Sequence, residues 1–349
     1  MNAHADTLPV ARTPAHRTHR FALLLRREFW EHKGGFLWAP FIAGAISLLL
    51  TMVFIVIAHV AANRTSSDAR IMLDDGSSMS INGLDLGVLT SQLSAQDKLQ
   101  LANGIDVTML LSSSWPFIVL AFVMFFYCLG ALYDERKDRS VLFWKSLPVS
   151  DGETVLSKVV SVALVAPLLA TLAAIATMLA FLAMLSVVVM FHGGNAWELI
   201  WGPGSPALIA VQLLAAIPVY AVWALPTIGW LMLCSVWSRS KPFLWALMVP
   251  VLSGTFVSMF GVMRLFNADA SWFWGHVVAR MLLGVVPLTP MDIARLDGAD
   301  LDGPGGMSLL LGVPQVYSNL LSPSMWIGAA AGIAMLYAAT RLRRWRDDG

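Results

Sequence analysis

The sequence predicts an all-α, polytopic membrane protein with six transmembrane helices and with both termini in the cytoplasm. Of its 349 residues, 57% are hydrophobic and 13% are charged, and the mean hydropathy is +0.69. A soluble chain of this length has no single core large enough to enclose that much apolar surface. Six apolar segments and an uneven distribution of Lys and Arg supply the rest of the prediction.

A helix needs roughly 20 apolar residues to cross the hydrocarbon core of a bilayer. Six segments meet this requirement: 37–60, 110–132, 159–190, 206–237, 243–266 and 325–340. The third and fourth are longer than necessary, so tilt or kinks at Pro167, Pro218 and Pro226 must absorb the excess. The first segment is too long for a signal-peptide core and is therefore predicted to remain as a helix.

Lys and Arg concentrate on one side of these spans. With both termini inside, 17 of the 23 Lys and Arg residues fall in cytoplasmic segments. This agrees with the positive-inside rule, by which cytoplasmic segments carry an excess of basic residues. We therefore expect a multi-pass protein of the bacterial inner membrane. Its expected parts are a disordered cytoplasmic tail 1–18, an amphipathic connecting helix 19–36, a transmembrane domain 37–340 with an outer loop 61–109, and a basic tail 341–349.

One further apolar stretch, 271–288, is close to a seventh span. It contains His276 and Arg280, and an ionised arginine is costly in the middle of a bilayer. A seventh crossing would also place the basic C-terminal tail outside, against the charge rule. We expect a re-entrant or interfacial helix within an outer region 267–324, with short outer helices between spans five and six, and a true span is the alternative.

The sequence contains no motif for catalysis or for nucleotide binding. It lacks a GxxxxGK[ST] phosphate loop and the HExxH, GxSxG and CxxC patterns. Cys128 and Cys234 lie in apolar runs, which favours neither a disulfide nor a metal site. His59, Gln212 and Arg264 are polar groups near the spans. Each is explained without a functional role, by a position at the edge of a span or at a contact between helices. We expect no enzyme activity, metal or cofactor in this chain.

The segment 19–36, HRFALLLRREFWEHKGGF, has the pattern of an amphipathic helix. Its predicted apolar face holds Phe21, Leu24, Leu25, Phe29 and Trp30, and its predicted polar face holds Arg26, Arg27, Glu28, Glu31 and Lys33. Such a helix fits the inner membrane interface, with Gly34-Gly35 bending the chain into span one. The alternative is a straight cytoplasmic extension of that span.

The predicted cytoplasmic loop 133–158, YDERKDRSVLFWKSLPVSDGETVLSK, mixes both charge signs with aromatic residues and a proline turn. This mixture suits docking into a groove of a partner protein, whereas a loop that only sets topology is the alternative. Ser150 or Asp151 is predicted to cap a helix that opens with Glu153 and continues into span three. The candidate docking residues are Asp134, Glu135, Arg136, Arg139, Val141, Leu142, Trp144, Lys145, Leu147, Pro148, Ser150 and Glu153.

These two segments resemble the coupling loop and the connecting helix of bacterial ABC-2 type transporter permeases, and the six-span architecture is similar to that family over the whole chain. The resemblance implies a permease that forms a homodimer or heterodimer in the lipid bilayer and exports its substrate. A separate ABC-type ATPase would bind ATP and Mg²⁺ and supply the energy. In the present chain, the resemblance implies that the connecting-helix residues are Arg26, Arg27, Glu28, Trp30 and Lys33. The outer loop 61–109 is longer than in compact members of the family.

Charge-free spans suggest a hydrophobic or amphipathic substrate and no binding of nucleic acid. Prolines in span four would let that helix bend, and small residues in span three would let helices approach closely: Ala163, Ala166, Ala170, Ala173, Ala174 and Ala176. The alternative function is a non-transporting membrane sensor or assembly protein whose outer loop binds a signal. An intramembrane enzyme would need catalytic polar groups that the spans lack.

Overall fold

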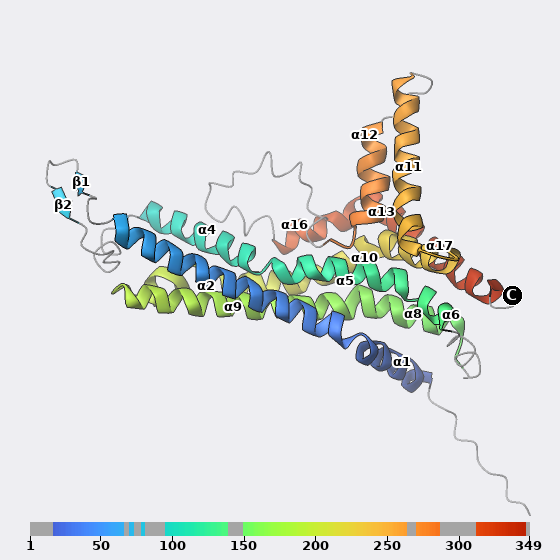
Figure 1. The fold of residues 1–349 in the computed structure, drawn as a ribbon, viewed down its shortest axis with the longest axis horizontal. Helices are drawn as coiled ribbons and strands as arrows, with labels where there is room; N and C mark the ends of the chain where they lie inside the picture. The colour runs from blue at the N-terminus through green and yellow to red at the C-terminus, as the bar shows by residue number, and fades with distance from the viewer. Residues whose placement is uncertain are drawn as a thin grey trace, which may run out of the picture.

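The chain forms a bundle of long helices (Figure 1). The computed structural model describes residues 17–65, 70–72, 78–80, 95–138, 149–263, 270–286 and 312–346. Six helical stretches are long and apolar enough to cross a membrane: Gly34–Ala61, Gln100–Lys137, Asp151–Phe191, Pro206–Trp237, Pro242–Phe260 and Pro323–Trp345. The prediction of a helical chain with six candidate membrane-spanning helices is confirmed, and these helices indicate a multi-pass membrane protein. A short antiparallel hairpin, β1 (Arg70–Met72) with β2 (Ser78–Ser80), was not predicted.

Span one continues directly from the amphipathic helix that precedes it. Helix α1 (Arg17–Glu31) leads through a π-helical turn, η1 (Gly34–Trp38), into α2 (Ala39–Thr65). The backbone N–H of Ala39 donates to the carbonyl of Gly34, which closes the wide turn. At the two glycines, where a bend was expected, the structure has a change of helical register, because a π turn inserts one residue into the helical repeat.

Span two is built from three consecutive helices, α4 (Ala95–Ser112), α5 (Trp115–Gly130) and α6 (Tyr133–Lys137). The hydroxyls of Ser112, Ser113 and Ser114 donate to carbonyls three residues earlier. Such bonds compete with the helical ladder, and the helix is interrupted at this point. Helix α4 thus occupies part of the predicted outer loop 61–109 and extends the line of span two.

Span three begins with the predicted cap. The hydroxyl of Ser150 accepts from the backbone of Glu153, and the carboxylate of Glu153 accepts from the backbone of Ser150, a complete capping box. Helix α8 (Asp151–Val160) then passes through a π turn, η2 (Ser161–Val165), into α9 (Ala166–Phe191). Five of the six alanines expected to allow close packing are buried, and Ala176 is exposed.

The remaining elements follow in the order η3 (Trp197–Trp201), α10 (Pro206–Trp237), α11 (Pro242–Val262), α12 (Ala270–Phe273), η4 (Trp274–Val278), α13 (Ala279–Leu283), α16 (Val313–Ser318), η5 (Asn319–Leu321) and α17 (Pro323–Arg346). Helices α2, α5, α9 and α10 run side by side, and α17 packs along α10 (Figure 1). Helix α11 instead stands at a steep angle to this bundle, paired with the α12–α13 segment.

The stretch 270–283 is too short to cross a bilayer. Fourteen helical residues rise about 21 Å, less than the roughly 30 Å of a hydrocarbon core. Arg280 donates to the carbonyls of Ser324 (2.6 Å) and Met325 (3.3 Å), and its guanidinium lies 4.2 Å from the ring centre of Trp223. Arg280, whose charge was the reason for not predicting a seventh span, therefore connects α13 to α10 and α17.

Helices α10 and α17 approach to backbone contact at two glycines. A Cβ atom placed on Gly229 would lie 2.5 Å from the carbonyl oxygen of Gly332, and one on Gly332 would lie 2.5 Å from the carbonyl of Leu225. Gly328 and Gly332 form a GxxxG pair, the spacing that permits such approach in membrane helices. This spacing is visible in the sequence, but close packing through small residues was predicted for span three alone.

We expect Gly332→Ala and Gly104→Ala to change stability in opposite directions. Alanine is the better helix former by about 0.5–1 kcal/mol, and a Cβ on Gly104 meets nothing within 4 Å, so Gly104→Ala should stabilise the protein. Gly332→Ala should cost about 1–3 kcal/mol because its Cβ meets backbone that cannot yield. Thermal unfolding in detergent measures both, and stabilisation by both would contradict the close helix contact.

Candidate functional site

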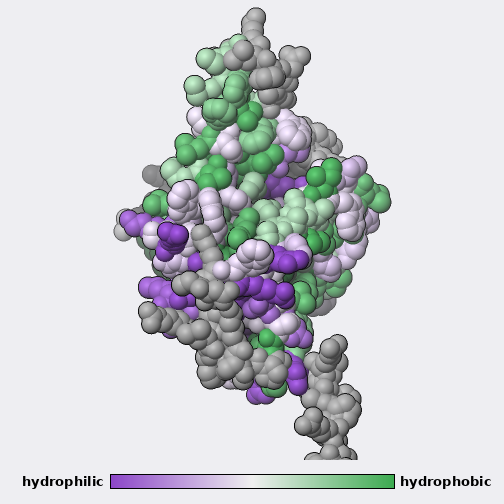
Figure 2. All heavy atoms as spheres, turned by 90° about the vertical axis from the view of Figure 1, so that its right-hand side faces the viewer, coloured by the Kyte–Doolittle hydropathy of each residue, from purple (hydrophilic) through white to green (hydrophobic). Residues whose placement is uncertain are grey.

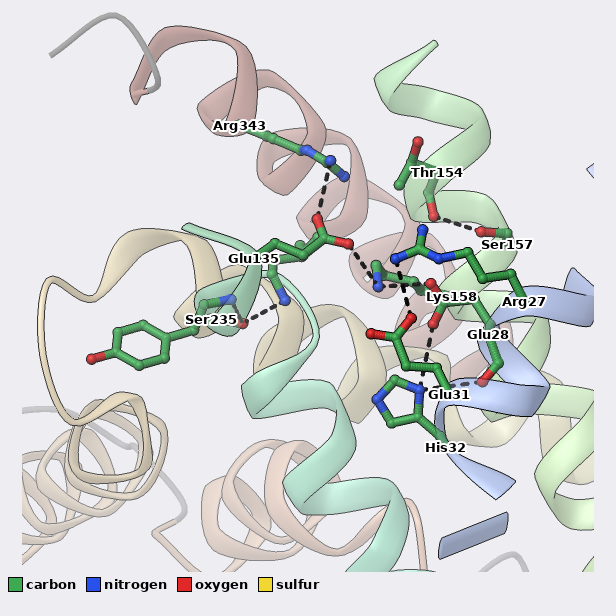
Figure 3. A network of polar contacts seen from close by, with 12 residues as sticks. Arg27, Glu28, Glu31, His32, Glu135, Thr154, Ser157, Lys158, Ser235 and Arg343 are labelled. Carbon is green, nitrogen blue, oxygen red and sulfur yellow. Dashed lines mark hydrogen bonds and ion pairs between the residues drawn. The ribbon is translucent and has the colours of Figure 1, made fainter. Parts of the chain in front are cut away.

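Charged side chains from distant parts of the sequence meet at the end of the bundle that carries α1 and the last turn of α17. Lys158, in the last turn of α8, is at the centre (Figure 3). Its Nζ lies 2.9 Å from Oε1 of Glu28 on α1 and 3.0 Å from Oε1 of Glu135 on α6. One ammonium group therefore pairs with carboxylates from two segments that were predicted as separate features, the connecting helix and the loop.

Three further contacts extend this set of ion pairs. We define the ion-pair network as Glu28, Tyr127, Glu135, Asp151, Lys158 and Arg343. Arg343 on α17 lies 3.1 Å from Glu135 and 3.6 Å from Asp151, measured between nitrogen and oxygen atoms. The hydroxyl of Tyr127 on α5 donates to Oε2 of Glu28 at 2.9 Å. Candidate spans one, two, three and six are thereby joined at one end.

The central groups of the network are shielded from solvent. Glu28 is 2% exposed, Lys158 and Arg343 are each 3% exposed, and Glu135 is 9% exposed. Burying an isolated charge is very costly, so these groups are tolerable only because each faces an opposite charge at short distance. The same end of the molecule gathers hydrophilic side chains on its surface (Figure 2).

The carboxyl of Glu28 illustrates this balance. Burial alone would raise its pKa, but the attraction of Lys158 and the hydrogen bonds from Lys158 and Tyr127 outweigh burial and hold the pKa below the ordinary value of 4.5. Glu28 is thus the ionised partner of Lys158 at neutral pH.

Arg136 connects span four to the same end. Its Nη2 donates to the carbonyl oxygens of Ser235 (2.7 Å) and Ser238 (2.9 Å), at the C-terminus of α10. A cation is favourable there because the last carbonyls of a helix lack intrahelical partners. The hydroxyl of Ser235 in turn accepts from the backbone N–H groups of Leu132 (3.2 Å) and Tyr133 (2.9 Å).

A half-open cavity of about 470 Å³ adjoins the network between α1 and the α5–α6 end. Four carboxylates and two fixed cations line it, together with His32 and apolar groups. The carboxylates belong to Glu31, Asp134, Glu135 and Asp138, and the cations to Arg27 and Lys158. Asp134 and Asp138 are exposed one helical turn apart, so the rim of the cavity is acidic.

The structure places five of the predicted docking residues at the two ends of the loop. Glu135 and Arg136 are held by the contacts described above, Asp134 is exposed beside them, and Ser150 and Glu153 form the cap of α8. Seven others lie outside the described residues: Arg139, Val141, Leu142, Trp144, Lys145, Leu147 and Pro148.

The predicted polar face of the connecting helix is wrong at one position. Glu28 was assigned to the polar face, yet it points into the protein because Lys158 and Tyr127 bind it. On the predicted apolar face, Trp30 is 57% exposed and Leu24 is 8% exposed. Lys33 lies over the Trp30 ring at 4.9 Å, Arg27 pairs with Glu31 at 3.1 Å, and Arg26 is exposed.

Lys158, Arg343 and Tyr127 were not predicted as members of a site. Lys158 and Arg343 entered the prediction only as basic residues that set topology. A signal existed, because Glu28, Glu135 and Asp151 are acidic and lie close to the inner ends of predicted spans, where basic residues predominate. This signal alone could not single out the three residues, because Glu31, Asp134 and Asp138 are acidic residues of the same segments and are exposed.

Removing the central cation should be strongly destabilising. Lys158→Met removes the cation that lies between the buried carboxylates of Glu28 and Glu135, and leaves Glu135 with Arg343 and Glu28 with the Tyr127 hydroxyl. Breaking a buried ion pair costs about 3–5 kcal/mol. Arg344→Met is the matched control, because the side chain of Arg344 is 60% exposed and pairs with Asp151 at 3.5 Å, a pair worth up to about 1 kcal/mol. Thermal unfolding followed by tryptophan fluorescence in detergent compares them. Equal losses in the two variants would show that burial of the network is unimportant.

The Glu28–Lys158 pair should also weaken in acid. Because the folded-state pKa of Glu28 is below 4.5, its contribution to stability is fully present above pH 4.5 and is lost as the pH falls through the folded-state pKa. The difference in melting temperature between the wild type and Glu28→Gln should therefore be largest above pH 4.5 and shrink below it. A difference that grows on acidification would reverse the assigned sign.

Comparison with models of known protein families, with curated proteins and with solved structures found no match. Among the described residues, no group of three or more His, Cys, Asp or Glu side chains is placed to hold a metal ion. The chain is thus identified by its architecture, as a helical protein with six candidate membrane spans and a buried ion-pair network at one end.

Proposed function

We propose that this chain is the membrane-spanning permease subunit of an ABC-2 type transporter, driven by a separate ATPase subunit, and that it exports a hydrophobic or amphipathic substrate across a bacterial inner membrane. One observation carries the proposal: the two segments that resemble the family's connecting helix and coupling loop touch each other. Lys158, the last residue of the loop segment, binds Glu28 of the connecting helix as well as Glu135 of its own segment. The segments were singled out independently from the sequence, and their junction is buried.

The network offers a route by which movement of the loop can reach the spans. Glu135 precedes the loop segment 139–148, and Asp151 and Lys158 follow it, so both ends of the loop belong to one set of ion pairs. Glu28 and Arg343 extend that set to α1 and α17. A partner that displaces the loop would therefore act on spans one, two, three and six together.

The acidic cavity supports the same assignment of partner. Its carboxylates Asp134 and Asp138 are exposed and stand directly before the loop. Carboxylates in such a position attract a basic side chain, and a charged contact at an interface fixes orientation as well as affinity. In our proposal the ATPase supplies that basic side chain, and the end of the bundle with the network faces the cytoplasm with both termini.

Copurification tests the proposal. The tagged chain is expressed with the soluble ATPase encoded beside its gene, and purified in detergent. We expect the ATPase to co-elute and to hydrolyse ATP. If the chain elutes alone, with the melting temperature of the folded protein, a non-transporting sensor or assembly protein becomes the better interpretation.

Charge reversal at the cavity rim tests the proposed contact. The double variant Asp134→Lys, Asp138→Lys should reduce co-elution of the ATPase by about tenfold or more, because like charges at an interface cost several kcal/mol. Glu198→Lys is the control, since Glu198 is exposed on η3 in the connection between α9 and α10. Normal co-elution of the double variant, with the melting temperature unchanged in both proteins, would exclude the rim as the contact.

A further inference from the structure

Two histidines meet at the end of the bundle opposite the ion-pair network. His59 lies near the end of α2, and His192 directly follows α9. Nδ1 of His59 and Nε2 of His192 are 3.3 Å apart, and the two ring centres are 5.3 Å apart. From the sequence, His59 had a plain interpretation at the edge of a span, and nothing connected it with His192.

The backbone and one hydrogen bond fix the ring of His192. His192 is the C-cap of α9, and Gly193 follows it in the left-handed conformation with φ 73°. The N–H of Gly194 donates to the carbonyl of Val189 (3.0 Å) and that of Gly193 to Met190 (3.2 Å), the Schellman arrangement. Nδ1 of His192 lies 2.8 Å from the carbonyl oxygen of Val188. Because a carbonyl only accepts, Nδ1 carries the proton and Nε2 presents its lone pair to His59.

The distance between the two nitrogens matches that of two imidazoles bound to one metal ion. Zinc binds imidazole nitrogen at about 2.0–2.1 Å in tetrahedral geometry, so two ligating nitrogens are separated by about 3.3–3.4 Å. The observed 3.3 Å agrees with this separation, and without a metal ion the same contact is a hydrogen bond from Nδ1 of His59 to Nε2 of His192. A ring N–H held by a backbone carbonyl, as in His192, is the usual second interaction of a metal-binding histidine.

We propose that His59 and His192 form an open, two-ligand site for a divalent transition metal that prefers imidazole, with Zn²⁺ as the expected ion. His59 is exposed and His192 is half-buried, so the remaining coordination positions are accessible to water. The bound ion would join α2 to α9 at the end opposite to the one where Glu28 and Lys158 join the same two helical stretches. This inference does not depend on the proposed transport function.

Metal-dependent thermal stability tests the site. The full chain, purified through a tag without histidine and treated with chelator, is heated in detergent with increasing ZnCl₂ or, in parallel, MgCl₂. Because a ligand that binds the folded state stabilises it, Zn²⁺ should raise the melting temperature saturably by about 2–8 °C. Mg²⁺ should have no effect, since it prefers oxygen ligands.

Single variants distinguish this site from other histidines of the chain. His59→Gln and His192→Gln should each abolish the zinc-dependent shift, because one imidazole alone binds weakly. His276→Gln should keep it, since His276 is an exposed histidine that stacks on Trp272 elsewhere in the fold. The proposal is overturned if Zn²⁺ leaves the wild type unchanged, or if either single variant retains the full shift.

Discussion

The structure depends on the pairing of one buried lysine with two buried glutamates. Lys158 and its partners sit where solvent is almost absent, so each charge would be prohibitively costly without the others. The helices that carry them can therefore pack only in arrangements that bring Glu28, Glu135 and Lys158 together. Buried ion pairs add little net stability over apolar residues of the same shape, and here they specify which helix ends belong together.

Away from this end, two pairs of helices approach closely through small residues. Gly229 and Gly332 bring the backbones of α10 and α17 into contact, and Gly44 on α2 faces the hydroxyl of Thr177 on α9 at similarly short range. Packing of small residues holds membrane helices together without directional bonds between side chains. Ion pairs thus determine which helices meet at one end of the bundle. Small residues allow the close approach of α10 to α17 and of α2 to α9.

The sequence was sufficient to predict the six candidate membrane-spanning helices because hydrophobic length is a local property. Ser150 and Glu153 formed the predicted cap because a capping box needs only residues three apart. Glu28 was misplaced because amphipathic periodicity sends charged residues to the polar face unless a partner is known. That partner, Lys158, lies 130 positions away, and no spacing rule links the two. The π turns η1 and η2 were likewise unforeseen, because the register they supply depends on the packing of whole helices.

The first helical stretch (α1–α2) and the third (α8–α9) are in contact at both ends and in the middle. Glu28 meets Lys158 at one end, Gly44 faces Thr177 in the middle, and His59 meets His192 at the other end. The two end contacts differ in kind, because the ion pair is buried, whereas the histidine pair is partly open to solvent and can therefore be reached by a metal ion.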